Sequence, residues 1–95
     1  MADAAADESF PPIGEVVPRQ HVRVRGHVQR VTMQPRDGMP FLEIVVSDGT
    51  GRARVVWTGR RIIGGVHVGR LLVVEGVPAE SDGEALFTNP AYELR

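Results

Sequence analysis

The sequence predicts an all-β domain in which five short strands curl into a small barrel. Apolar and polar residues alternate with a period of two through most of the chain after position 20, as they do in half-buried strands. Turns rich in Gly, Asp, Asn and Pro separate these stretches, and no long helix is expected. Ninety-five residues make one small domain, so a sheet of this size must curl to cover its apolar face.

The first predicted strand begins at His21 and ends near Arg36. Its alternation gives an inner face of Val22, Val24, Gly26 and Val28 and an outer face of Arg23, Arg25, His27 and Gln29. A glycine within a strand indicates a sharp bend or a bulge, so Gly26 predicts the point where this strand curls between two parts of the sheet. A loop follows over residues 35–40, where Asp37-Gly38 supplies the turn.

Two further strands are expected over residues 41–48 and 52–57, with a tight turn over 47–51. Alternation places Leu42, Ile44, Val46, Ala53, Val55 and Trp57 on the inner face, and Phe41, Glu43, Arg52 and Arg54 on the outer face. Trp57 is therefore interpreted as a core residue. Glu43 is expected to form a cross-strand ion pair with one of the outward arginines.

The rest of the chain predicts one irregular segment and two more strands. Residues 59–69 contain four glycines and lose the alternation, which indicates an irregular or short helical connection. A fourth strand is expected over 70–77, a hairpin turn over 78–83 and a fifth strand over 84–89. This order favours a five-stranded Greek-key barrel of the OB-fold type over an SH3-like barrel, because the connection between strands three and four is long.

The composition excludes several classes of protein. The chain is 42% apolar and 24% charged with a net charge of −1, which is typical of a globular domain. It has no cysteine, so disulfides and thiol chemistry are excluded, and His21 and His27 would lie about 20 Å apart on one strand, too far to share a metal ion. No apolar run is long enough for a membrane helix, no signal peptide is evident and no catalytic arrangement is suggested by spacing. We expect a non-catalytic, cytoplasmic, monomeric protein without a cofactor or a metal.

Charge is distributed unevenly along the chain. Residues 1–18 carry four acids and no base, and we interpret them as an acidic, largely disordered tail and lead-in. Residues 19–95, the predicted domain, hold all 11 arginines against 8 acids, a net charge of +3. The chain has no lysine, and arginine brings planar, forked donors that suit phosphate and stack on bases.

Several short motifs carry a family resemblance over residues 20–95. They are the Asp48-Gly49-Thr50-Gly51 turn, Trp57 at the end of strand three, Gly69 before Glu75-Gly76, and Asn89-Pro90 before Tyr92-Glu93. With these motifs the chain resembles the OB-fold nucleic-acid-binding family, which includes tRNA-anticodon-type modules, and is most similar to a stand-alone form of the wedge domain of RecG helicases. The resemblance implies nucleic-acid binding. ATP-driven unwinding is excluded because the chain has no phosphate-binding loop of the GxxxxGK[ST] type.

The outward arginines predict where nucleic acid would bind. Outward residues two apart on a strand are spaced by about 6.6 Å, so such rows can follow a single-stranded backbone. Basic rows beside an exposed aromatic ring are typical of sequence-tolerant binding of single strands. We expect single-stranded DNA, with RNA second, to contact Arg23, Arg25, His27, Arg36, Phe41, Arg52, Arg54, Arg60, Arg61 and Phe87.

The alternative interpretation is a protein-interaction or oligomerisation module. A net charge of +3 is modest for a nucleic-acid binder, and few aromatic residues are available for stacking. An outward apolar patch formed by Val45, Val56, Leu71 and Val73 would favour this alternative.

Overall fold

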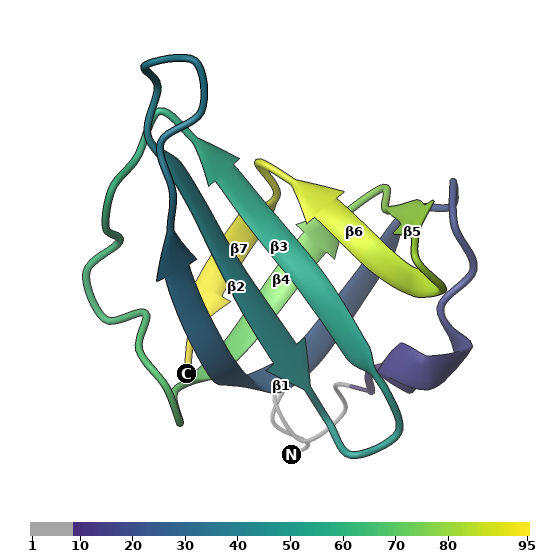
Figure 1. Cartoon of the computed structure of the whole chain (residues 1–95). Coiled ribbons are helices and arrows are strands. Elements are labelled where there is room, and N and C mark those ends of the chain that lie inside the picture. Colours follow the sequence, from purple (N-terminus) through teal and green to yellow (C-terminus); the bar gives the residue numbers. More distant parts are fainter. Residues whose placement is uncertain (1–8) are drawn as a thin grey trace.

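The computed structural model describes residues 9–95 as one curled, seven-stranded sheet (Figure 1). The elements are η1 (Ile13–Glu15), β1 (Val22–Met33), β2 (Phe41–Ser47), β3 (Arg52–Thr58), β4 (Leu71–Gly76), β5 (Ala79–Ser81), β6 (Glu84–Thr88) and β7 (Ala91–Leu94). The order across the sheet is β5-β6-β3-β2-β1-β4-β7, with β6 parallel to β3 and every other pair antiparallel. This arrangement confirms the predicted all-β OB-fold, including the irregular connection over residues 59–69.

Two short strands extend the predicted set of five. Within the hairpin turn predicted over residues 78–83, residues 79–81 form β5, which pairs with β6 across a tight turn at Asp82-Gly83. After β6 the chain kinks at Asn89-Pro90 and continues as β7, which pairs with β4. Because β6 lies on β3 and β7 lies on β4, the last part of the chain bridges the two ends of the curled sheet. No ladder joins β6 to β7, so the ring of hydrogen bonds is not closed among residues 9–95.

Asn89 holds this kink against the end of β3 through hydrogen bonds. It adopts a left-handed conformation with φ of 51°, which asparagine tolerates better than most residues. Its backbone N–H donates to the Val56 carbonyl at 2.7 Å, and its side-chain oxygen accepts from the Thr58 N–H at 3.0 Å. Its amide also donates to the Thr58 hydroxyl at 3.1 Å. One side chain therefore sets the direction in which the last strand leaves the barrel.

Strand β1 changes partners at the predicted bend. Its first half pairs with β4 as far as His27, and its second half pairs with β2 from His27 onward. A Cβ atom at Gly26 would lie 3.0 Å from the Ser47 carbonyl oxygen and 3.1 Å from Cδ1 of Ile13. A side chain here would push these neighbours apart, so glycine is favoured where the three segments approach closely. The bulge itself lies further along, between Val28 and Arg30.

The inner faces form one apolar core, as the alternation predicts. Val24, Ile44 and Val55 are fully buried, and Trp57 is 3% exposed, which confirms it as a core residue. The ring of Trp57 meets Tyr92 edge-on, with the centroids 5.4 Å apart. Phe87 also lies in this core, at 1% exposure.

The lead-in to β1 packs against the barrel through Ile13, which is 3% exposed and belongs to the core. The Ile13 N–H donates to the Asp48 carboxylate at 2.9 Å, and the Gly14 N–H donates to the Thr50 hydroxyl at 3.0 Å. A Cβ atom on Gly14 would lie 2.5 Å from the Thr50 carbonyl oxygen, so only glycine fits. The turn between β2 and β3 thus anchors η1, an interaction that local sequence patterns do not reveal. The predicted disorder of the tail falls mostly on residues 1–8, outside the described residues.

Candidate nucleic-acid interface

A bulge at Gln29 adds an arginine to the outer face of the sheet. Val28 pairs with Val46, but Arg30 rather than Gln29 pairs with Val45, so β1 has one extra residue here. After the bulge the even-numbered residues face outward, and Arg30 joins the row of Arg25 and His27. The sequence prediction missed Arg30. The signal was present: the apolar positions Val28 and Val31 are three apart, which breaks a period of two.

Two neighbouring hollows run along this face and share Gln29. The larger hollow, of about 370 Å³, is lined by Arg25, His27, Gln29, Ser47, Asp48, Gly49 and Leu71. The smaller hollow, of about 210 Å³, is lined by Gln29, Arg30, Val45 and Arg52. We call the two together the basic hollow. It unites three arginines and one histidine with one acid, so the structure brings the predicted residues Arg25, His27 and Arg52 to one place.

The two arginines of β3 have acidic neighbours. Arg52 forms an ion pair with Glu84 of β6 at 2.9 Å, but its side chain is 62% exposed and its outer donors stay accessible. Arg54 is only 26% exposed, lies 3.8 Å from Glu43, and donates to the Ser81 hydroxyl. The Arg54–Glu43 pair is the cross-strand ion pair expected for Glu43. Arg54 therefore ties β2, β3 and β5 together more than it offers charge to a ligand.

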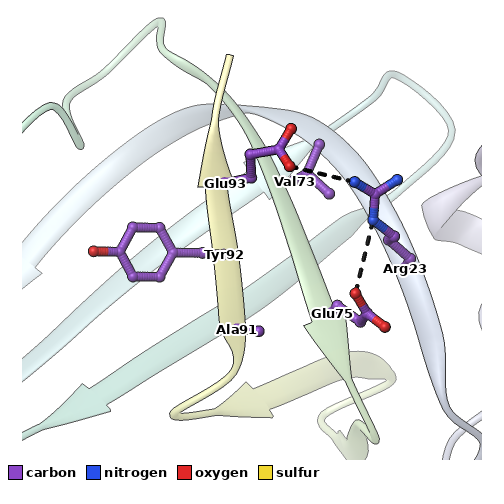
Figure 2. A pocket seen from close by; sticks show the side chains of 6 residues that line it. All are labelled: Arg23, Val73, Glu75, Ala91, Tyr92 and Glu93. Atoms are coloured by element: carbon purple, nitrogen blue, oxygen red, sulfur yellow. Dashed lines mark ion pairs between the residues drawn. The ribbon is translucent and has the colours of Figure 1, made fainter. Parts of the chain in front are cut away.

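Arg23 lies outside the basic hollow. Its guanidinium is held between Glu75 of β4 at 3.7 Å and Glu93 of β7 at 3.5 Å (Figure 2). The small hollow beside it, of about 90 Å³, is also lined by Val73, Ala91 and Tyr92. The sequence predicts Arg23 and Arg25 as equal members of one row, whereas in the structure the acids of β4 and β7 offset the charge of Arg23.

Phe10, just before η1, covers the two arginines of the first half of β1. The Phe10 ring centroid lies 4.9 Å from the guanidinium carbon of Arg25 and 5.3 Å from that of Arg23. Guanidinium groups at such distances are attracted to the face of an aromatic ring. Arg25 forms no ion pair with any residue from 9 to 95, so the aromatic ring is its main neighbour.

A cationic platform lies at the other end of the outer face. The guanidinium of Arg36 stacks over the ring of Phe41, with 4.2 Å from its carbon to the ring centroid. Arg36 and Met39 exchange backbone hydrogen bonds of 2.8 and 2.9 Å, which fix the loop that carries the platform. The predicted residues Arg36 and Phe41 thus form one unit, in which the arginine covers one face of the ring.

Three other predicted site residues lie elsewhere. Arg60 and Arg61 are exposed on the 59–69 segment, and neither lines the basic hollow. The expectation that Phe87 faces outward for stacking is wrong, because alternation in β6 directs Ala85 and Phe87 into the core. Leu86 takes the outward position instead.

The apolar patch that would favour a protein-interaction module is not exposed. Val45, Val56 and Val73 are 6%, 5% and 2% exposed, and Leu71 is half-buried. Val45 lies directly opposite Arg54 of β3, so these two side chains are neighbours on the outer face.

Asp48 is the acid at the edge of the basic hollow. Partial burial raises the pKa of Asp48, but hydrogen bonds from the Thr50 hydroxyl and from the backbone N–H groups of Ile13 and Thr50 outweigh this and hold the pKa below its usual value. Its carboxylate is thus committed to anchoring η1. Between residues 9 and 95, no group of three or more metal-binding side chains is found, and no helix is long and apolar enough to cross a membrane.

A curled sheet with this strand order fits an OB-fold. Residues 22–95 match the tRNA_anti-codon family, described as an OB-fold nucleic acid binding domain, and the chain belongs to this family. No curated protein matches the chain significantly.

Among solved structures, the fold is similar to part of RecG in its complex with a three-way DNA junction. The TM-score is 0.75 with 17% sequence identity, over 92% of this chain. The chain corresponds to only 13% of the length of that RecG chain, so the likeness concerns the fold of one domain.

Proposed function

We propose that this domain binds single-stranded nucleic acid, preferably DNA and with RNA second, along the basic hollow. The proposal is supported mainly by the positions of Arg25 and Arg30, which lie in the two hollows that share Gln29. Neither arginine forms an ion pair with a residue in the described part of the chain, and both line the hollow. Two guanidinium groups with unused donors in one concave strip suit successive phosphates of a single strand.

Electrostatic capture is the main step of the proposed mechanism. Arg25, Arg30 and the outer donors of Arg52 attract the phosphates, and His27 offers a further polar contact. With three to five phosphates contacted along the basic hollow, the slope of log K against log salt is expected to be about −2 to −3.5.

Base stacking supplies a smaller share of the binding. Phe41 carries Arg36 on one face, so a base that stacks there meets a guanidinium plane, which is a suitable surface for it. A single platform of this kind recognises the π-face of any base and gives little sequence preference. The domain is accordingly expected to discriminate strand type more than sequence.

We infer a binding role rather than a catalytic one. His27, Ser47 and Asp48 all line the larger part of the hollow, but no hydrogen bond links the three. The Asp48 carboxylate accepts from Ile13 and Thr50, and the Ser47 hydroxyl accepts from the Gly49 N–H at 3.1 Å. A nucleophile needs a base within hydrogen-bond reach, and this trio lacks that connection.

Fluorescence anisotropy with labelled single-stranded DNA, single-stranded RNA and duplex DNA over a salt series tests the proposal. The Arg25→Glu/Arg30→Glu variant should bind single strands at least tenfold more weakly, with a slope shallower by about 1.4 for two lost phosphates. Arg19→Glu is the control because Arg19 is exposed in the lead-in and lines neither part of the hollow. Equal affinity of the double variant and the wild type, with both folded, would reject the site.

A further inference from the structure

An apolar groove lies between the second half of β1 and the 59–69 segment. It measures about 370 Å³ and is lined by Val31, Met33, Leu42, Arg61, Ile62, Ile63, Val66, His67 and Val68. Ile63 and Val66 are buried anchors at its floor, whereas Ile62 is 78% and Val68 63% exposed. In Figure 1 the 59–69 segment, in green, runs along the outside of β1. Exposed apolar side chains gathered in this way indicate an interaction site.

The Gln29 bulge also creates this groove. Val31 and Met33 are odd-numbered and would face outward with Arg25 if β1 kept one phase. The extra residue reverses the phase, so they pair with Ile44 and Leu42 of the inner face. At the end of the barrel they extend beyond the core and remain 38% and 42% exposed.

The same half of β1 has an unpaired backbone edge. On the β4 side, its last contacts are the Val28 N–H with the Arg70 carbonyl at 2.9 Å and the Val28 carbonyl with the Gly69 N–H at 2.7 Å. On the β2 side, Gln34 donates to Phe41 at 2.9 Å. Hydrogen-bonded positions alternate along an antiparallel pair, so the N–H and C=O groups of Val31 and Met33 point away from β2 and into the groove.

The charges around the groove have one sign. Arg61 and His67 line it, and no acid does. Residues 59–70 include Arg60, Arg61 and Arg70 and no Asp or Glu. A second copy of this chain, added through its own β1 edge, would place like-charged arginines against each other. A ligand with acidic side chains would complement the positive charge around the groove.

We propose that this groove binds an extended segment of a partner protein in which apolar and acidic residues alternate. The segment adds as a strand to the free edge of β1 between Gln29 and Met33, and its backbone pairs with Val31 and Met33. Its apolar side chains pack against Ile62 and Val68, while its acidic side chains face Arg61. This proposal does not depend on nucleic-acid binding, because the groove and the basic hollow share no lining residue.

The test uses short labelled peptides that alternate Val, Ile, Leu or Phe with Asp, Lys or Ser, and measures binding by anisotropy. We expect the aspartate peptides to bind and the lysine peptides not to bind. Binding should slow hydrogen exchange at the Val31 and Met33 amides, which a purely side-chain contact would not do. An excess of single-stranded DNA should leave the peptide in place.

Two variants and a control locate the peptide. Ile62→Glu should weaken binding about tenfold without harming the fold, because the side chain is exposed. Val31→Pro removes an N–H that β2 does not use, and it should abolish strand addition. Val77→Glu changes an apolar residue of 60% exposure elsewhere and should leave binding unchanged.

Four results would overturn the proposal. They are no binding by any aspartate peptide, unchanged binding in Val31→Pro, displacement of the peptide by DNA, and self-association of the chain that Ile62→Glu abolishes. The last result would assign the groove to a second copy. Hydrogen exchange of the wild-type protein alone adds a check, since protected Val31 and Met33 amides would show that the edge is already occupied.

Discussion

The basic hollow and the apolar groove lie on opposite faces of β1, and one inserted residue adds Arg30 to the first and Val31 and Met33 to the second. In the first half of the strand, a regular ladder to β4 places Arg23 beside Glu75 and Glu93, which offset its charge. In the second half, the bulge at Gln29 turns Arg30 outward and Val31 inward. Register, and not composition, therefore decides which arginines can meet a ligand.

Gly26 should have the largest effect, because it holds both halves of β1 in place. Gly26→Val would push a branched side chain against the Ser47 carbonyl and Ile13, and we expect a loss of about 2–4 kcal/mol in the free energy of unfolding. Chemical denaturation measures this loss. Gly64→Ala is the control, since no atom lies within 4 Å of a Cβ there and its stability should change by less than about 0.5 kcal/mol. A wild-type midpoint for Gly26→Val would show that the close approach is not needed.

Two single-residue deletions at the bulge test whether Arg30 contacts the nucleic acid. Removing Gln29 leaves Arg30 to pair with Val45 in a regular ladder, whereas removing Arg30 leaves Gln29 in that position. Both proteins should keep the same inner and outer faces. Affinity for single-stranded DNA should stay within about threefold in the first deletion and fall about tenfold in the second, with a salt slope shallower by about 0.7. Equal affinities would mean that Arg30 contributes no contact.

Deleting the N-terminal tail should have the next largest effect on DNA affinity, because Phe10 covers the arginines in the first half of β1. Deletion of residues 1–12 removes the Phe10 ring from Arg25 and also removes Asp3, Asp7 and Glu8. We expect binding of single-stranded DNA to tighten severalfold at low salt and the gain to vanish at high salt, where charges are screened. Phe10→Ala in the full chain separates the ring from the acids. Unchanged or weaker affinity of the deletion would reject competition by the tail.

The faces of the strands could be predicted from the sequence because a period of two leaves little choice where apolar and polar residues alternate cleanly. This holds for Leu42, Ile44 and Val55, all of which are buried. It fails in β6, where Leu86 and Phe87 are both apolar and either phase is consistent with the pattern. In the structure the ring of Phe87 is buried and Leu86 faces outward.

The candidate site was only partly predictable, because its charges depend on strand neighbours. Arg52 lies near Glu84 only because β6 runs parallel to β3, and such a pairing leaves no local trace. The contribution of Phe10 likewise depends on where the lead-in crosses the barrel. Unlike these two contacts, the bulge could be predicted from the sequence, because the three-residue spacing of Val28 and Val31 breaks the period of two.

The smallest effect is expected at Asp48, which links the edge of the basic hollow to the lead-in that carries Phe10. Its pKa is lowered from 3.8 in the folded protein, so its stabilising effect is complete well above that value and is lost as the pH falls through the folded pKa. Asp48→Asn should therefore lower stability at pH 7 by up to about 1 kcal/mol, a modest figure because the carboxylate is exposed and screened by solvent.

The difference between Asp48→Asn and the wild type should shrink below about pH 4, where the unfolded carboxyl begins to protonate. Thermal unfolding at several pH values measures it, with Asp82→Asn at the β5–β6 turn as the exposed control. If η1 also loosens, Phe10 should leave Arg25 and DNA affinity should rise slightly at neutral pH, in the same direction as the tail deletion. A stability difference that stays constant from pH 7 to pH 3 would show that charge at Asp48 is not what holds the lead-in.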